Sequence, residues 1–253
     1  GSKLSVFGSS GSGLSLKTGD LDLCLQLPDA NQKKIIKRMS GMLRGQGMEN
    51  VQALTRAKVP IVKFSDPRSG IQVDISINNI LALHNTNLLS KYAKLDKRVR
   101  QLAVCVKHWA LHRNLSDAPN GTLSSYGWSI LVINHLISEG VITNLQSGED
   151  RTLVEIGSHE FDVTINEIEK FESTSKATLS ELVYSFFTKY ATWDWNNQII
   201  SIRNGAPLSR DEKGWMNEEP SALDVVNSKK EKPPRMGEHH LSIEDPFEVD
   251  HDL

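Results

Sequence analysis

Apolar and polar residues alternate without a break between residues 20 and 27. A period of two predicts a β-strand with one buried face, here formed by Leu21, Leu23, Leu25 and Leu27. Asp20 and Asp22 lie on the opposite face, with their Cα atoms roughly 6.5–7 Å apart. Two carboxylates on one face repel each other, and a divalent cation is the usual partner that relieves this repulsion. We therefore expect a sheet with one apolar face and one face that carries these acids.

Two further runs extend the predicted sheet. Val59 to Phe64 and Ile71 to Ile77 are strand candidates, and in the second run Asp74 has the same phase as Asp20 and Asp22. If these strands adjoin, three carboxylates converge and can hold two Mg²⁺ ions about 3.5–4 Å apart, an arrangement used for in-line phosphoryl transfer. The Asp-x-Asp spacing is common, so solvent-facing aspartates remain the simpler interpretation of that motif alone.

A stretch rich in glycine and serine precedes the acidic strand. The β-prone run Leu4 to Phe7 ends in Gly-Ser-Ser-Gly-Ser-Gly at residues 8–13, which predicts a strand followed by a loop. Free backbone N–H groups in such a loop can cradle a triphosphate beside the acidic strand. A Walker loop is the rival interpretation, but Lys17 follows Leu16 and the chain has no Gly-Lys pair. A flexible linker is the remaining alternative.

Helical periodicity dominates the rest of the chain. The runs with this spacing are Asn31 to Leu43, Leu95 to Arg113, Ser124 to Glu139 and a segment with an N-cap at Ser180. The polar stretch from Arg210 to His240 predicts a long loop, and we assign His239 and His240 to solvent. We thus predict a small α/β unit over residues 1–80 and a mainly helical unit over residues 81–253.

Composition excludes several classes of protein. The chain has 253 residues, of which 38% are hydrophobic, and it contains no run of 18 apolar residues, so we expect no membrane association. Its two cysteines, Cys24 and Cys105, have no Cys-x-x-Cys partner, which argues against a disulfide framework or a zinc site and favours a reducing compartment such as the cytoplasm.

A net charge of −2 argues at first against binding to nucleic acid, but the charge is unevenly distributed. Residues 211–253 contain 12 acidic and 5 basic residues, which leaves residues 1–210 with a balance of +5. The segment from Lys91 to Arg113 carries seven basic residues and one acid, Asp96. We expect an RNA or triphosphate track there, with ordinary helix solvation as the alternative.

Several motifs in collinear order resemble one family. They are Phe7-Gly8-Ser9, Lys17 to Cys24, Val73 to Asn79, Leu83 to Thr86, Val106 to Ala110, Gly121 to Gly127, Leu179 to Leu182 and Ile243 to Glu248. In this set the chain resembles the DNA polymerase β-like nucleotidyltransferases, in the terminal uridylyltransferase and poly(A) polymerase branch of the caffeine-induced death protein type. The resemblance covers nearly the whole chain. It implies an α+β fold, with a mixed-sheet catalytic domain over 1–80, a helical poly(A)-polymerase-associated domain over 81–253, and a cleft between them.

The resemblance also implies roles for single residues. Asp20, Asp22 and Asp74 match the catalytic carboxylates that bind Mg²⁺ or Mn²⁺, and Asp74 also matches the one that activates the RNA 3′-hydroxyl. The positions that match nucleotide contacts are Gly8 and Ser9 at the phosphates, Asn85 at the ribose and base, Lys107 and Ser125 at the triphosphate, and Tyr126 as the stacking aromatic. Taken alone, Lys107 is more simply a solvated lysine and Tyr126 a core residue.

The last residues of the chain match the positions around the base. Asp245 and Glu248 correspond to acids near the base edge, and His251 falls where uridine-selective members carry a histidine that crowds out a purine. One departure is Leu111, which stands where many relatives carry a second lysine one helical turn after the first. The resemblance therefore implies a weaker triphosphate grip, or one supplied by His112 or Arg113.

The function expected from these residues is template-independent transfer of UMP from UTP to RNA 3′ ends. Preference for ATP or CTP is the alternative within the same family, and an inactive RNA-binding homologue is the alternative of another class. The intact set of three carboxylates argues against the inactive homologue. We expect a monomeric core of a longer protein, with RNA and a nucleotide as its ligands and with target choice set by a protein partner or by flanking sequence.

Overall fold

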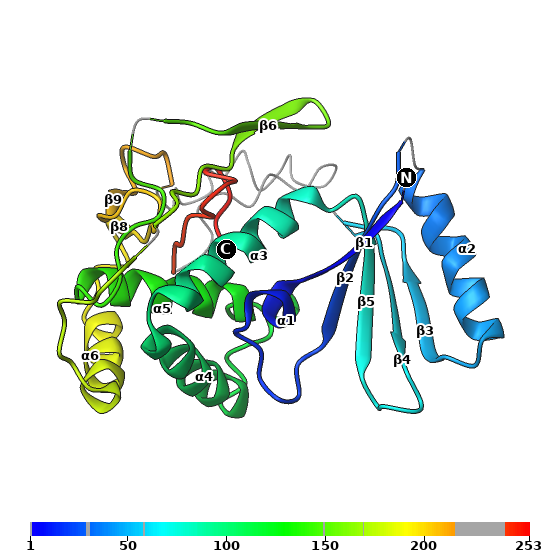
Figure 1. The fold of residues 1–253 in the computed structure, drawn as a ribbon, viewed down its shortest axis with the longest axis horizontal. Helices are drawn as coiled ribbons and strands as arrows, with labels where there is room; N and C mark the ends of the chain where they lie inside the picture. Colours follow the sequence, from blue (N-terminus) through cyan, green and yellow to red (C-terminus); the bar gives the residue numbers. More distant parts are fainter. Residues whose placement is uncertain (1, 29–30, 58, 149, 169, 216–240) are drawn as a thin grey trace, which may run out of the picture.

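A computed structural model describes residues 2–28, 31–57, 59–148, 150–168, 170–215 and 241–253. The first part of the chain forms a five-stranded mixed sheet of β1 (Lys3–Phe7), β2 (Leu21–Gln26), β3 (Glu49–Leu54), β4 (Ile61–Ser65) and β5 (Gln72–Ile77). The strand order is β1-β2-β5-β4-β3, and β2 pairs with β5 in parallel while the other pairs are antiparallel (Figure 1). We call this part, together with the helix that covers it, the sheet lobe.

The predicted strands are confirmed, and one strand is added. The alternating leucines form β2 as expected, and the two later runs form β4 and β5 with their ends shifted by one or two residues. The edge strand β3 was not predicted, because its sequence Glu-Asn-Val-Gln-Ala-Leu places only Val51 and Ala53 against the core. Such a weak apolar alternation does not stand out from a loop.

One helix packs on the apolar face of the sheet. Helix α2 (Gln32–Gly45) begins at the N-cap Asn31, whose side chain accepts a hydrogen bond from the Lys34 backbone N–H. The buried residues of this core are Ile36, Val62, Phe64, Val73, Ile75 and Ile77. The opposite face of β2 and β5 is thereby left to polar side chains.

The glycine- and serine-rich stretch is not a loop, and this prediction was wrong. Residues Gly8–Ser12 form a short helix, α1, which packs against α3 (Ile80–Leu95). Gly8 has a φ of 67°, so the chain turns sharply out of β1 in a conformation that favours glycine. Gly11 approaches α3 so closely that a Cβ there would lie 2.8 Å from Thr86 Cγ2. Tertiary packing against α3 thus overrides the low helix propensity of the sequence.

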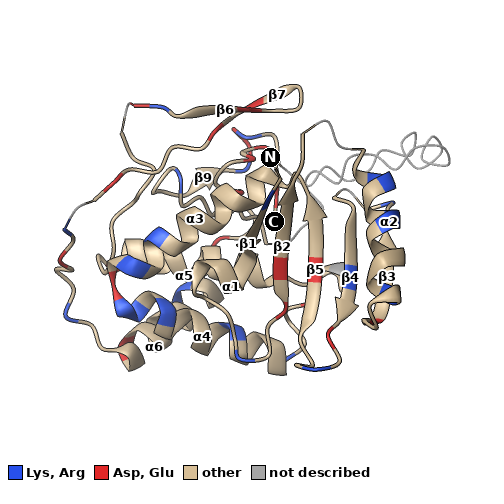
Figure 2. Cartoon of the chain, turned by 45° about the vertical axis from the view of Figure 1, so that its right-hand side comes forward, with Lys and Arg blue, Asp and Glu red and all other residues tan. Residues whose placement is uncertain are grey.

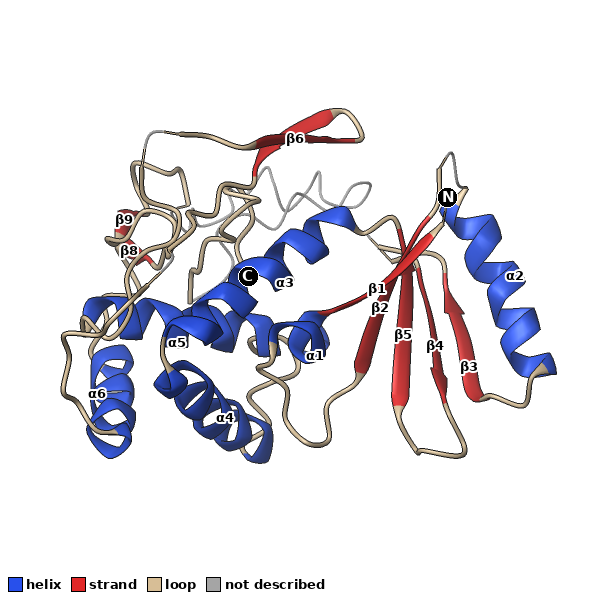
Figure 3. Cartoon of the chain, in the orientation of Figure 1, coloured by secondary structure: helices blue, strands red, loops and turns tan. Residues whose placement is uncertain are grey.

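The rest of the chain is mainly helical, and we call it the helical lobe (Figure 3). Helix α3 was not predicted as a separate element, because its apolar residues are not confined to one stripe. Helices α4 (Lys97–His112) and α5 (Ser125–Ser138) match the predicted runs, and Asp96 ends α3 while it caps α4. Helix α6 (Leu179–Ala191) is capped by Thr178 in a capping box with Glu181, and not by Ser180.

Short elements that the sequence did not reveal complete this lobe. They are the 3₁₀ turn η1 (Ala118–Asn120), the hairpin of β6 (Leu153–Ile156) and β7 (His159–Asp162), and the hairpin of β8 (Gln198–Ile199) and β9 (Leu208–Ser209). The last residues return to this lobe, because Ile243 forms a parallel bridge with Ile200. Most of the predicted loop from Arg210 to His240, with His239 and His240, lies outside the described residues.

The two lobes have separate hydrophobic cores. The helical core includes Tyr92, Trp128 and Phe186, and it also takes in Leu14 from the segment that follows α1. Cys24 is buried and Cys105 is exposed, and both are free thiols. No helix among the described residues is both long enough and apolar enough to cross a membrane. The division at residue 80 remains a prediction.

Candidate active site

The centre of the sheet carries two neighbouring carboxylates. Asp22 of β2 and Asp74 of β5 are directly opposite each other in the parallel register, so their side chains leave the same face of adjacent strands. Figure 2 shows the two acidic positions side by side in the middle of the sheet. Asp20 lies one residue before β2 and is exposed. The convergence expected from the strand phases is thus realised closely for Asp22 and Asp74, with Asp20 at the edge.

Burial and mutual repulsion make these carboxylates costly to ionise. The pKa of Asp22 is raised to about 6, first by burial and then by the charges of Asp74 and Asp20. Burial also raises the pKa of Asp74, although Lys63 of the adjacent strand β4 forms an ion pair with its Oδ2 at 3.0 Å. The other oxygen, Oδ1, is buried without a hydrogen-bond partner. One lysine therefore compensates only part of this negative charge.

The donor set fits a divalent metal ion. Carboxylate oxygens are the ligands that Mg²⁺ prefers, and Asp74 Oδ1 is a buried acceptor with no partner. Gly8 lies so close that a Cβ there would be 2.2 Å from Asp22 Oδ2, so only glycine leaves this carboxylate accessible. Among the described residues, no three histidine, cysteine, aspartate or glutamate side chains already enclose an ion. Asp20 is exposed, and its charge still raises the pKa values of Asp22 and Asp74.

A cavity of about 370 Å³ opens beside Asp22. It collects seven of the predicted residues, which are Gly8, Ser9, Asp22, Asn85, Lys107, Ser125 and Tyr126. It also contains residues that were not predicted, among them Ser12, Thr86, Ser124 and Ser129. Residues from β2, α1, α3, α4 and α5 therefore line one space between the two lobes. The described residues Asp20, Asp74, Asp245, Glu248 and His251 are not among those that line it.

Thr86 is the most informative of the missed residues. Its Oγ1 accepts a hydrogen bond from the Gly8 backbone N–H at 2.9 Å and donates one to the Ala82 carbonyl at 2.7 Å. The hydroxyl thus fixes the start of α1 against α3. Thr86 directly follows Asn85 in the sequence, but a threonine within a helix gives no signal of such a contact.

Lys107 is not a solvated lysine. It is only 4% exposed, and its Nζ donates a hydrogen bond of 2.7 Å to the Leu14 carbonyl in the segment after α1. Burial lowers the pKa of Lys107 to about 8. A buried ammonium that lines the cavity is a point charge that an anionic group can reach.

Two other basic residues of the predicted track form ion pairs within the protein. Lys91 forms an ion pair with Glu167, and Arg98 pairs with Asp96 at 2.7 Å. Leu111, the departure from the family pattern, is 46% exposed and lines a second hollow with Lys17, Arg100 and His112. Lys94, Lys97 and Arg100 of the track are exposed, and an RNA or triphosphate track along these helices remains a prediction.

Tyr126 and Asn85 present buried polar atoms at the cavity. The Tyr126 hydroxyl and Asn85 Oδ1 are both buried without a hydrogen bond of good geometry among the described residues. The pKa of Tyr126 is raised well above its usual range, first by burial and then by the nearby carboxylate of Asp245. Asp245 therefore lies close to the tyrosine although it does not line the cavity.

The last residues form a compact turn. Asp245 Oδ1 accepts hydrogen bonds from the backbone N–H groups of Phe247 and Glu248 at 2.8 and 2.9 Å. Burial raises the pKa of Asp245. His251 is 45% exposed at its side chain, and its Nδ1 lies 3.7 Å from Glu248 Oε2. The structure thus brings Asp245 towards Tyr126, while His251 pairs with Glu248 near the surface.

Comparison with known proteins places this geometry in a family. The profile of the poly(A) RNA polymerase, mitochondrial-like, central palm domain matches residues 1–94, and that of the Cid1 family poly A polymerase matches residues 178–251. A crystal structure of the Cid1 poly(U) polymerase superposes with a TM-score of 0.80 and 32% identity, over 99% of this chain and 73% of that one. The chain belongs to the Cid1 family of poly(A) polymerases.

Relatives of this Cid1-family chain carry two different activities in their names. The chain is 34% identical to terminal uridylyltransferase Cid1 of Schizosaccharomyces pombe in an alignment 266 positions long. This alignment covers 99% of this chain and 63% of the relative. It is 37% identical to poly(A) RNA polymerase GLD2-B of Xenopus laevis over 232 residues, which cover 85% of this chain and 45% of the relative. The chain thus spans about half to two thirds of the length of these relatives.

The first matched segment of the Cid1-family chain lines the cavity, and the second comes close to it. The first segment supplies Gly8, Asp22 and Asn85, and the second contains Asp245, which lies near Tyr126. Lys107 and Tyr126 come from the helices between the two matched segments. The family resemblance and the α+β fold expected from the sequence are both confirmed.

Proposed function

We propose that the protein is an RNA 3′-terminal nucleotidyltransferase that adds UMP from UTP without a template. The observation that carries the proposal is the adjacent pair of Asp22 and Asp74 beside a cavity with a buried lysine and a buried tyrosine. The relatives support the broader class, since the Cid1 protein is named a terminal uridylyltransferase and the GLD2-B protein a poly(A) RNA polymerase.

The chain's own residues would prepare both reactants. Asp74, at the face of the sheet, would accept the proton of the RNA 3′-hydroxyl, which then attacks the α-phosphorus and displaces pyrophosphate. Gly8 and Ser9 would hold the phosphates with Ser125, and the Lys107 ammonium would neutralise the leaving group. Asp20, Asp22 and Asp74 would hold Mg²⁺ or Mn²⁺, which when bound lowers the pKa of the hydroxyl and neutralises phosphate charge. Solved structures of Cid1 described as Mg-nucleotide complexes support this choice of metal.

Recognition of the nucleotide would rest on the helical lobe. Tyr126 would stack on the base, Asn85 would meet the ribose and base, and the Asp245 turn would face the base edge. His251 would favour uracil by occupying space that a purine needs. Relatives of both activities match this chain, so uridine selectivity is the most specific part of the proposal.

Offering the four nucleotides separately to the protein with a single-stranded RNA primer tests the proposal. We expect UMP addition to exceed AMP addition, and His251→Ala to reduce that preference. Equal or greater AMP addition would reject uridine selectivity and favour a poly(A) polymerase, and greater CMP addition would favour a CTP-adding enzyme. No extension with any nucleotide would favour an inactive RNA-binding homologue.

The ligands and the location follow the same reasoning. Structures of Cid1 with its short product ApU and with the UTP analogue UMPNPP support RNA and a nucleotide as the ligands. One solved structure that is 33% identical to this chain is described as that of a cytoplasmic RNA terminal U-transferase, which supports a cytoplasmic location here. We further propose that the protein acts as a monomer and that a protein partner or flanking sequence selects its RNA.

A further inference from the structure

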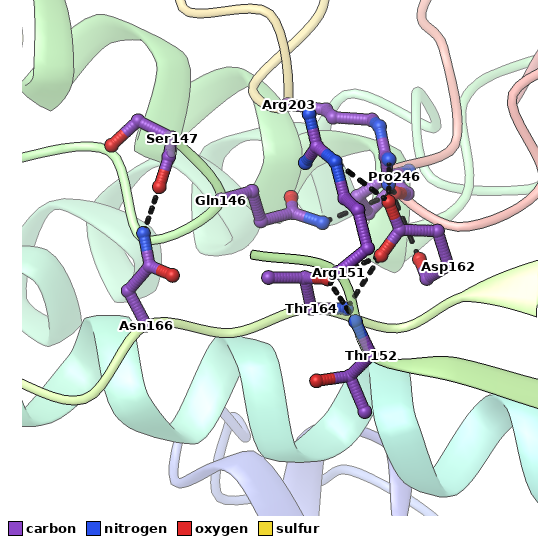
Figure 4. Close-up of polar contacts among 9 residues, drawn as sticks. All are labelled: Gln146, Ser147, Arg151, Thr152, Asp162, Thr164, Asn166, Arg203 and Pro246. Atoms are coloured by element: carbon purple, nitrogen blue, oxygen red, sulfur yellow. Dashed lines mark hydrogen bonds and ion pairs between the residues drawn. The ribbon is translucent and has the colours of Figure 1, made fainter. Parts of the chain in front are cut away.

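One carbonyl in the turn that contains Asp245 is hydrogen-bonded to two side chains of the helical lobe. Backbone pairing holds the residues just before the turn, where the Ile200 N–H donates to Ser242 O at 3.0 Å and the Glu244 N–H to Ile200 O at 2.9 Å. This pairing stops at Glu244. Two residues further on, the carbonyl of Pro246 accepts hydrogen bonds from two side chains, those of Gln146 and Arg203 (Figure 4).

Arg203 links this carbonyl to the β6–β7 hairpin. Its Nη1 donates to Pro246 O at 3.3 Å and to Asp162 O at 3.2 Å, and its Nη2 bonds the Asp162 carboxylate. Asp162 is the last residue of β7, and its Oδ1 accepts the Thr164 backbone N–H at 3.0 Å. The planar guanidinium fits this fork of three acceptors because its donors point in fixed directions. The hairpin end therefore fixes the arginine, and the arginine fixes the turn.

Gln146 supports the same carbonyl from a buried position. It is 2% exposed, and its Nε2 donates to Pro246 O at 3.2 Å. The Gln146 backbone N–H is itself bound by Asn144 Oδ1 at 2.8 Å. Two donors from separate segments bind the Pro246 carbonyl. Together they restrict its orientation more than a single hydrogen bond would.

Internal bonds make the turn rigid but do not orient it. Asp245 Oδ1 binds the N–H groups of Phe247 and Glu248, and the Asp245 N–H donates to His251 O at 3.0 Å. These bonds stay within residues 245–251, and Phe247 sets the depth of the turn by packing in the core. The Pro246 carbonyl links the centre of this rigid unit to the lobe that carries Tyr126 by two hydrogen bonds.

We propose that Arg203 is a positioning residue that orients the Asp245 turn, and with it the base edge of the bound nucleotide, by holding the Pro246 carbonyl. The inference rests on the proposed function for its effect on the nucleotide, while the effect on the turn itself is independent of any activity. Arg203 does not line the nucleotide cavity, so it acts through the turn and not by touching the nucleotide.

Arg151 offers a matched control. Its Nε lies 3.5 Å from Asp162 Oδ2, so it shares the carboxylate with Arg203 (Figure 4), but no hydrogen bond is found between its side chain and Pro246 among the described residues. Arg203→Met and Arg151→Met thus remove the same charge from the same carboxylate, but only the first also removes a donor from the Pro246 carbonyl, which then keeps Gln146 alone. Arg203→Lys keeps the positive charge but loses the planar set of donors. Its amide exchange and its KM for UTP should therefore lie between those of the wild type and of Arg203→Met.

The experiment combines hydrogen exchange with kinetics on the full chain. In Arg203→Met we expect amide exchange in residues 245–251 to become at least tenfold faster than in Arg151→Met. The KM for UTP should rise about tenfold and the preference for UTP over ATP should fall several-fold, while kcat changes less than threefold. Arg203→Lys should restore part of both effects.

The results separate the two proposals. Unchanged exchange in residues 245–251 of a folded Arg203→Met protein would overturn the positioning role, whatever the activity. Faster exchange with the KM and base preference of Arg151→Met would overturn the link from the turn to the nucleotide. A wild-type protein that adds no nucleotide refutes the proposed function, and the exchange rates then decide alone whether Arg203 orients the turn.

Discussion

The sheet lobe and the helical lobe treat buried charge in opposite ways. In the sheet lobe, Asp22 and Asp74 lie side by side and one ion pair, with Lys63, compensates them in part. In the helical lobe, partly buried charges are matched, as in the pairs of Arg98 with Asp96 and Arg203 with Asp162. Uncompensated negative charge suits a site that binds cations, while matched pairs fix the shape of loops. The lobes are thus specialised for chemistry and for positioning.

Breaking the acidic pair should give the largest effect. Asp74→Asn removes the proposed proton acceptor and a metal ligand, so we expect RNA extension to fall about ten-thousandfold. Stability should not fall, because the change also removes a buried charge that repels Asp22 and Asp20. Primer extension and urea unfolding measure the two quantities. Asp66→Asn, in a turn of the same lobe, should leave RNA extension unchanged, and an active Asp74→Asn protein would refute the proposed role.

Breaking a matched ion pair in the helical lobe should lower stability and leave activity unchanged, the reverse of the result expected for Asp74→Asn. The Arg98 side chain binds the Asp96 carboxylate and the carbonyls of Ser175 and Ala177. Arg98→Met removes the side-chain donors of these acceptors and leaves the Asp96 charge without its cation, and we expect the free energy of unfolding to fall by about 3–4 kcal/mol. The activity of the molecules that remain folded should be retained. Arg100→Met, at an exposed position of the same helix, is the control, and equal stability of the two variants would contradict the comparison.

A buried histidine makes the helical lobe sensitive to acid. His135 is fully buried, and its pKa is lowered to about 4, first by burial and then by Lys189. The unfolded chain takes up the proton near pH 6.5, so this contribution is present above pH 6.5 and is lost as the pH falls towards 4. The loss is roughly 3 kcal/mol at 1.36 kcal/mol per pKa unit.

Urea midpoints between pH 4 and 7 test this loss. The stability of His135→Gln should fall less steeply with acid than that of the wild type, so the difference between them should shrink towards pH 4. His159→Gln, at an exposed position in β7, should follow the wild-type curve. Parallel curves for His135→Gln and the wild type would exclude the histidine as the source.

The residue at the boundary of the lobes should give the smallest effect. Lys107 joins α4 to the segment after α1 and lines the nucleotide cavity. Loss of one charge-assisted hydrogen bond in Lys107→Met should raise the KM for the nucleotide about 10- to 30-fold. The wild-type KM should also rise as the pH increases above about 8, where the lysine loses its proton. Lys97→Met, on the same helix but exposed, should keep the wild-type KM and its rise above about pH 8.

Much of the sheet was predictable, because its strands carry their own pattern. The alternation around Asp22 and Asp74 indicated which side chains share a face, and the parallel register then placed the two carboxylates opposite each other. The short helix α1 was not predictable, since glycine and serine favour loops and only packing against α3 makes them helical. The β6–β7 hairpin was missed for another reason, because its strands of four residues are too short for a period to emerge.

The sequence by itself determined the phase of the strands, the order of the motifs and the family to which they belong. Only the tertiary structure decided that Lys107 is buried, that Thr86 anchors Gly8, and that Arg203 reaches Pro246. Periodicity reports the face on which a residue lies, because the backbone repeats locally. It carries no information on which distant segment meets that face, since such contacts depend on how the lobes pack and where each hydrogen-bond donor finds its acceptor.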